Sequence, residues 1–144
     1  MSIDLEKAKF RTVTIGATAG NVTTYLQPTT LTTVSKRWLI LRGRLTLTTD
    51  GTVVNRTINL TPFSTGLAQP MEFIGNSGVI PASTTKSLSF GEGANSVGGT
   101  LGSGDDYIGL HRPIIIVNNN SLQIAIVNGV AGDSYSGYIE VLEL

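Results

Sequence analysis

Apolar and polar residues alternate along most of this chain, and a repeat of two residues is typical of strands with one buried face. The clearest stretch is RWLILRGRLTLT, residues 37–48. A glycine in the middle of a strand, here Gly43, indicates a bulge or a bend. One face would hold Leu39, Leu41, Gly43, Leu45 and Leu47, and the other Trp38, Ile40, Arg42, Arg44, Thr46 and Thr48.

The residues that follow predict a hairpin. TTDGT, residues 48–52, contains an Asp-Gly pair, which readily adopts the positive φ angles of a tight turn. VVNRTINL, residues 53–60, then returns with Val54, Ile58 and Leu60 directed inward beside Arg56. We therefore expect residues 37–60 to form one long antiparallel hairpin.

Further segments have the composition of strands, and turns rich in Gly, Pro and Asn separate them. Two prolines break residues 61–70, and the Gly-rich residues 91–106 are too long for a tight turn, so both segments are expected to be surface or contact loops. The additional strands are expected at 10–15, 22–26, 71–75, 86–90, 110–118, 121–128 and 135–144. In 121–128 one face would hold Leu122, Ile124 and Ile126. In 135–144 one side would hold Tyr135, Ile139 and Val141 and the other Tyr138, Glu140, Leu142 and Leu144, so that both sides carry apolar residues, as a subunit contact would require.

About eight strands with almost no helical pattern predict an all-β fold. We expect an antiparallel β-sandwich of the jelly-roll type, with an immunoglobulin-like sandwich as the alternative. Residues 1–12 would form an N-terminal arm or a short helical turn, and residues 13–144 a single sandwich domain, which 144 residues suffice to build. The chain has no cysteine, which excludes disulfides and thiolate metal sites.

Charged residues make up 14% of the chain, against about 25% in ordinary domains. A surface with so few charges is often covered by other subunits; the alternative is a β-protein coated with Thr and Ser. Residues 1–44 carry a net charge of +5 and residues 45–144 a net charge of −5, which could help subunits to dock. No basic run with interleaved aromatics and no apolar run long enough for a signal peptide or a membrane span is present, so we expect neither nucleic acid nor membrane as a partner.

The segment GDSYSG, residues 132–137, is close to the G-x-S-x-G elbow of serine hydrolases, in which the serine stands on a sharp turn between a strand and a helix. Ser136 occupies the place of the last glycine, and the following residues predict a strand. The single histidine, His111, precedes Ser134, whereas the elbow places it later in the chain. We therefore expect no catalytic residue, and a polar turn in which Asp133 or Ser134 bonds the backbone.

Acidic residues are the other candidates for chemistry. Asp105 and Asp106 follow a Gly-rich loop, but their spacing matches no calcium-binding loop, and one histidine without cysteine does not predict zinc. Glu72 and Glu92 could join them in a groove as paired carboxylates of a glycosidase, yet few aromatic residues are available as sugar platforms. We expect no metal and no cofactor.

Two segments resemble known families. RWLILRGRLTLTTDGTVVNRTINL is similar to segments in jelly-roll domains of bacteriophage structural proteins, where a long strand with outward basic residues turns at a T-D-x-T corner and returns through an N-R pair. DSYSGYIEVLEL is similar to the last strand of trimeric jelly rolls of the complement and tumour-necrosis-factor type, which lies near the threefold axis. The collagen stalk of the animal proteins is absent, so their ligands are not carried over. The resemblance implies a small viral jelly roll that oligomerises, in the role of a capsid decoration (cement) protein, a head fibre or a receptor-binding tip.

We therefore expect a non-enzymatic structural protein of a phage virion, made in the host cytoplasm and located on the capsid surface. It would stabilise the head as a homo-oligomer, with a trimer as the first expectation, and contact the major capsid protein or another virion protein. The alternative is a module that binds a receptor or a glycan, with the tyrosines Tyr25, Tyr107, Tyr135 and Tyr138 as candidates. The residues expected at capsid or subunit contacts are Lys7, Lys9, Arg11, Tyr135, Tyr138, Leu142 and Leu144.

Overall fold

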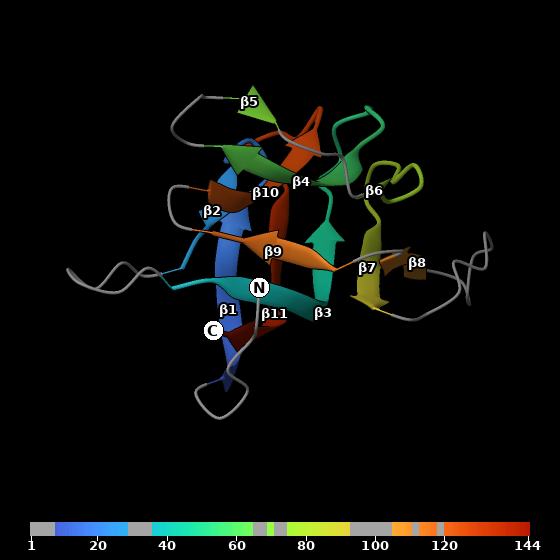
Figure 1. The fold of residues 1–144 in the computed structure, drawn as a ribbon. Helices are drawn as coiled ribbons and strands as arrows, with labels where there is room; N and C mark the ends of the chain where they lie inside the picture. The colour runs from blue at the N-terminus through green and yellow to red at the C-terminus, as the bar shows by residue number, and fades with distance from the viewer. Residues whose placement is uncertain are drawn as a thin grey trace.

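The protein folds into two stacked β-sheets (Figure 1). The computed structural model describes residues 8–28, 36–64, 69–70, 75–92, 105–110, 113–117 and 120–144, and every regular element among them is a strand. The expected all-β sandwich is confirmed.

The first sheet contains the longest strands of the chain. In order across the sheet they are β1 (Lys9–Ala19), β11 (Ser134–Glu143), β3 (Trp38–Thr48), β7 (Thr85–Glu92) and β8 (Asp105–Leu110). A short strand, β9 (Ile114–Ile116), pairs with the first three residues of β3. The pairs are antiparallel except β7 and β8, which run parallel.

The second sheet is smaller. It is formed by β2 (Thr24–Leu26), β10 (Asn120–Val127), β4 (Thr57–Ser64) and β5 (Gln69–Pro70), with β6 (Gly75–Asn76) as a further partner of β4. The antiparallel pairs of the two sheets are nested along the chain: β1 pairs with β11, β2 with β10, β3 with β7, and β4 with β5 and β6.

The hydrophobic core lies between the two sheets. Each strand contributes the apolar residues that alternate along it, as the period of two requires. In β10 these are Leu122, Ile124 and Ile126, as expected from the sequence. Those of the other long strands are Ile15, Trp38, Ile40, Leu45, Leu47, Ile58, Leu60, Leu88, Phe90, Tyr135, Ile139 and Val141.

The expected hairpin over residues 37–60 is wrong, because β3 and β4 lie in different sheets. The polar turn at Asp50 exists, and the Asp50 carboxylate accepts a hydrogen bond of 2.9 Å from the Thr52 N–H. The chain then crosses to the second sheet instead of returning along β3. Arg56, the last residue before β4, is completely buried, and its charge holds this crossover against two carboxylates at the end of the sandwich.

The expected faces of β3 hold only for its second half. The register with β11 shifts between the pairs Glu140–Arg42 and Val141–Ile40, so Leu41 is an extra residue in a β-bulge. Before the bulge Trp38 and Ile40 face the core; after it the core-facing positions are Gly43, Leu45 and Leu47. Figure 1 shows β3 bending midway, and its partner on one side changes there from β9 to β7.

Two expected segment boundaries also change. Residues 9–12 belong to β1, paired with β11 from Glu143 to Glu140, so they are not part of an arm. β4 continues through Pro62 to Ser64, into the expected loop 61–70. β8 begins at Asp105 inside the expected loop 91–106 and ends at Leu110, the first residue of the expected strand 110–118. Residues 1–7, 29–35, 65–68, 71–74, 93–104, 111–112 and 118–119 lie outside the described part of the chain, including His111, most of the expected loop 91–106 and the middle of the expected loop 61–70.

Candidate functional site

The segment GDSYSG forms a turn that leads into β11, and in it Asp133 and Tyr135 are buried whereas Ser134 is exposed. Ser134 is exposed at the first position of β11, and a strand follows it, as the sequence predicted. Asp133 is 1% exposed, and its carboxylate accepts hydrogen bonds from the backbone N–H groups of Asp50 (2.9 Å) and Val130 (3.0 Å). This geometry matches the polar turn expected at this place.

Asp133 also binds Arg56, which the sequence did not reveal. The Arg56 guanidinium donates from Nε and Nη2 to the two Asp133 oxygens, at 3.0 and 2.9 Å, and from Nη2 to Asp50 Oδ1 at 2.8 Å. Nη1 donates to the carbonyls of Thr52 (2.7 Å) and Val54 (2.5 Å). All five N–H donors of this buried guanidinium thus have acceptors, which is what makes burial of the charge tolerable.

Burial by itself would raise the pKa of Asp133. The hydrogen bonds from Val130, Asp50 and Arg56, together with the Arg56 charge, outweigh it and hold the pKa of Asp133 below its usual value. The carboxylate is therefore ionised at neutral pH and fixed by its partners. We call Asp50, Arg56 and Asp133 the crossover cluster; the hydrogen bonds of Asp133 to Arg56 and to two backbone N–H groups stabilise the end of the sandwich.

A second buried carboxylate lies at the other end of β11. Glu143 is 5% exposed and accepts hydrogen bonds from Lys36 Nζ (2.7 Å), Arg11 Nη1 (2.9 Å) and Trp38 Nε1 (3.1 Å). Burial would raise the pKa of Glu143, but these three hydrogen bonds and the Arg11 charge lower it to about 2. A carboxylate held this firmly in its charged form cannot act as a general acid near neutral pH.

The solvent side of the first sheet carries an exposed row of apolar side chains. Phe10, Leu142, Leu39 and Ile115 stand directly opposite one another on β1, β11, β3 and β9, so their side chains share one face. Phe10 is 57% exposed and Ile115 43%, and the two leucines between them are partly exposed. We call these four residues the apolar row. Leu144 extends the apolar row. Its backbone pairs with Arg37, two residues beyond the pair of Leu142 and Leu39, so its side chain is on the same face as that of Leu142.

A hollow lies on the same face of the first sheet. It is two rows of paired residues away from the apolar row, at Tyr138 instead of Leu142 on β11. Tyr138, Arg44, Ser89 and Tyr107 stand opposite one another on β11, β3, β7 and β8. The hollow has a volume of about 340 Å³, and its lining also includes Leu41, Arg42, Gly43, Phe90 and Gly91.

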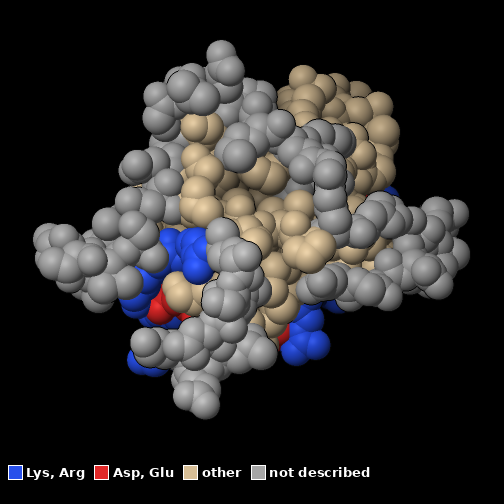
Figure 2. Space-filling view, viewed as in Figure 1, with Lys and Arg blue, Asp and Glu red and all other residues tan. Residues whose placement is uncertain are grey.

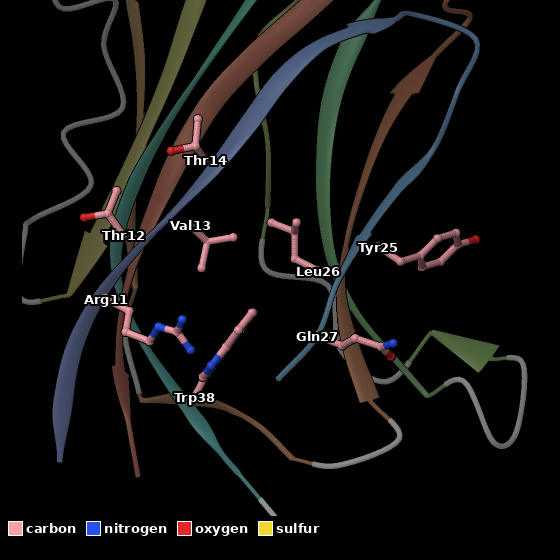
Figure 3. Close-up of a pocket in the computed structure, with 8 residues that line it drawn as sticks. All are labelled: Arg11, Thr12, Val13, Thr14, Tyr25, Leu26, Gln27 and Trp38. Atoms are coloured by element: carbon pink, nitrogen blue, oxygen red, sulfur yellow. The ribbon is translucent and has the colours of Figure 1, made fainter. Parts of the chain in front are cut away.

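A cleft of about 440 Å³ opens between β1 and β2, at the edge where the two sheets meet (Figure 3). Val13 and Leu26 point toward each other across it, with Arg11 and Trp38 at one end, whereas the Tyr25 side chain points away from it. Arg11 is the charged residue of this lining, and it already shares the Glu143 carboxylate. The cleft is therefore a weaker candidate for a charged ligand than the hollow.

Charged groups are few on the described surface. In the view of Figure 2 the blue side chains gather toward the lower half of the molecule, beside some red ones, and most of the remaining described surface is uncharged. Asp106, considered for a metal, accepts hydrogen bonds from Lys86 and from the Gly78 N–H instead. Within the residues that the structure describes, no three His, Asp or Glu residues are grouped to hold a metal ion, and no helix is long and apolar enough to cross a membrane.

The residues expected at contacts do not all lie on one surface. Leu142 and Leu144 lie at the apolar row, and Tyr138, 39% exposed, lines the hollow. Lys9 is exposed on β1, Arg11 is tied to Glu143, and Lys7 lies outside the described residues.

Tyr135 is an internal residue, because it is 1% exposed and its hydroxyl donates to the Val22 carbonyl (2.8 Å) and accepts from Thr24 (2.5 Å). Burial raises the pKa of Tyr135, and the bond with Thr24 offsets part of that rise. Its side chain therefore ties β11 to the start of the second sheet and is left out of the contact surface that we propose below.

Comparison with known proteins gives no relative. No protein-family model matches the chain, and neither a curated protein nor a solved structure matches it.

Proposed function

We propose that this chain is a non-enzymatic structural protein of a virion, a capsid decoration protein that acts as a homo-oligomer. The jelly-roll interpretation of the sandwich is part of this proposal. Nested antiparallel pairs support it: the outermost strands of the chain pair together, then the next ones inward, in two sheets with the orders β1-β11-β3-β7 and β2-β10-β4-β5. Eight strands wrapped in this way are found in viral capsid and lectin domains.

The apolar row carries the proposal. Four neighbouring strands place Phe10, Leu142, Leu39 and Ile115 side by side on a face that the second sheet does not cover. Strands about 4.8 Å apart make this row about 14 Å wide. Single exposed apolar residues are ordinary, but a contiguous set of them marks a surface that binds another protein.

The mechanism of such a protein is burial of surface rather than chemistry. Each copy would cover its apolar row against a second copy, and the oligomer, with a trimer as the first expectation, would bind the shell through several repeated contacts. Weak contacts repeated around a symmetric particle add up to firm attachment. The low fraction of charged residues, 14%, fits a surface that is covered in the assembled state.

Particles of the virus that encodes this chain provide the test. Particles made without the gene should lose their contents at a lower temperature, and added purified protein should restore their stability. The variant Phe10→Glu should fail to restore it, because a charge in the apolar row opposes burial.

The control is Val53→Glu, since Val53 is 96% exposed and lies on the crossover, outside the apolar row. Restoration by both variants, or by neither, would contradict the proposal.

A second candidate is a module that binds a glycan or a receptor. It is favoured by one observation: two of the four tyrosines considered for this role, Tyr107 and Tyr138, line the same hollow.

A further inference from the structure

The hollow on the first sheet exists because β7 carries small residues where its neighbours carry large ones. Ser89 and Gly91 form its floor between Tyr107 on β8 and Arg42 and Arg44 on β3. A methyl group added to Gly91 would lie 3.0 Å from the Tyr107 hydroxyl and 3.5 Å from Arg42 Cβ, so these two side chains flank the glycine closely. The hollow is therefore bounded by Tyr107 on one side and by Arg42 and Arg44 on the other.

The lining combines two aromatic rings with two positive charges. Tyr107 and Tyr138 stand at the ends of one register row, three strand spacings or about 14 Å apart at their backbones. Arg42 and Arg44 project between them, and Arg42, which donates to Glu140, keeps most of its side chain exposed. No carboxylate is among the residues that line the hollow; Glu140, which accepts from Arg42 Nε, stands opposite Arg42 on β11.

These features match one class of ligand. A pyranose ring has apolar faces that can pack on a tyrosine ring, and hydroxyls that can bond Ser89 and the tyrosine hydroxyls. A carboxylate on that ring would meet arginine, whose planar guanidinium is shaped to bind it. The volume of about 340 Å³ falls within the range of about 300–1,000 Å³ that is usual for small-molecule sites.

We propose that this hollow binds a carboxylated sugar residue, such as a uronic acid unit of a surface polysaccharide. Tyr107 packs against the sugar ring, and Arg44 with Arg42 binds the carboxylate. The site lies two rows away from the apolar row and does not depend on the assembly role proposed above, since Tyr107 and Arg44 take no part in that row.

The experiment titrates the purified full chain with a tetramer of galacturonic acid, followed by calorimetry. The matched probe is the same tetramer with its carboxylates methyl-esterified, which keeps the rings and removes the charge. We expect the acid form to bind and esterification to weaken binding about tenfold or more, as the loss of a charge-assisted hydrogen bond implies. No binding of the acid form at millimolar concentration, or equal binding of the ester, would overturn the proposal.

Variants locate the site. Tyr107→Ala and Arg44→Gln should each weaken binding of the acid tetramer about tenfold, whereas Tyr25→Ala should leave it unchanged. Tyr25 is a fair control, because it is also a tyrosine on a strand and is 48% exposed, but it lies on the second sheet. Thermal unfolding of each variant shows that it is folded, and a loss of binding in Tyr25→Ala equal to that in Tyr107→Ala would place the site elsewhere.

Discussion

Replacing Asp133 by Asn tests the role that we assign to the GDSYSG segment. Asparagine keeps the size of the side chain and one carbonyl oxygen, but it removes the negative charge opposite Arg56. Arg56 would then remain completely buried with Asp50 as its charged partner, and Asp50 is itself 31% exposed. The change therefore leaves a buried cation with about half of its neutralising charge.

The expected loss of stability follows from this geometry. Removing one partner of a buried ion pair costs about 3–5 kcal/mol, and the remaining bond to Asp50 favours the lower end, about 3 kcal/mol. At about 2.1 cal/mol/K per residue, 144 residues give an unfolding entropy of about 0.3 kcal/mol/K. The melting temperature of Asp133→Asn should thus fall by about 10 °C.

Thermal unfolding followed by circular dichroism at pH 7 measures this loss, with Ser134→Ala as the matched control. Ser134 is the next residue and is exposed, so its substitution should shift the melting temperature by no more than about 2 °C. The reasoning would be refuted by a fall of less than about 3 °C in Asp133→Asn, or by an equal fall in Ser134→Ala.

Three further changes have defined outcomes. Because the folded-state pKa of Glu143 is lowered from 4.5 to about 2, its charge contributes about 3 kcal/mol that is present above pH 4.5 and lost as the pH falls toward 2. Urea unfolding should therefore show a gap between wild type and Glu143→Gln that is widest near pH 6 and narrows by pH 3. Gly43→Val should lower the unfolding midpoint strongly, since even its Cβ would lie 2.4 Å from the Phe90 ring and 2.7 Å from the Tyr138 carbonyl. Tyr135→Phe should cost about 1 kcal/mol in the same assay, as the Val22 carbonyl and the Thr24 hydroxyl lose their partner.

The sequence predicted the sandwich because its strands alternate strongly. In β10 and in the second half of β3 the apolar residues expected inside are inside, and in β11 Tyr135, Ile139 and Val141 share the buried face as expected. These positions depend only on the local period of two, which the sequence displays directly.

The pairing of strands could not be predicted in the same way. The Asp50-Gly51 turn has the same local chemistry whether a hairpin or a crossover follows it. A useful signal was Arg56, because a charged residue among inward-facing positions requires buried partners, but its partner Asp133 lies 77 residues away. Gly43 indicated a bulge or a bend in β3, but the extra residue, Leu41, could not be located from the pattern, since apolar residues stand on both sides of it.

The candidate sites were likewise predictable only where one strand supplies them. Leu142 and Leu144 were identified from the apolar residues on both faces of the last strand. The hollow could not be predicted, because it joins residues of β3, β7, β8 and β11 that meet only in the folded sheet.

The central claim of this account is that the apolar row is covered by a second copy of the chain. Light scattering coupled to size-exclusion chromatography tests it most directly, with wild type and Leu142→Glu compared at equal concentration. The account predicts that wild type elutes as an oligomer with a mass of at least two chains, and that Leu142→Glu elutes as a folded monomer. A wild-type protein that remains monomeric at every concentration, or a Leu142→Glu variant that assembles as wild type does, would contradict it.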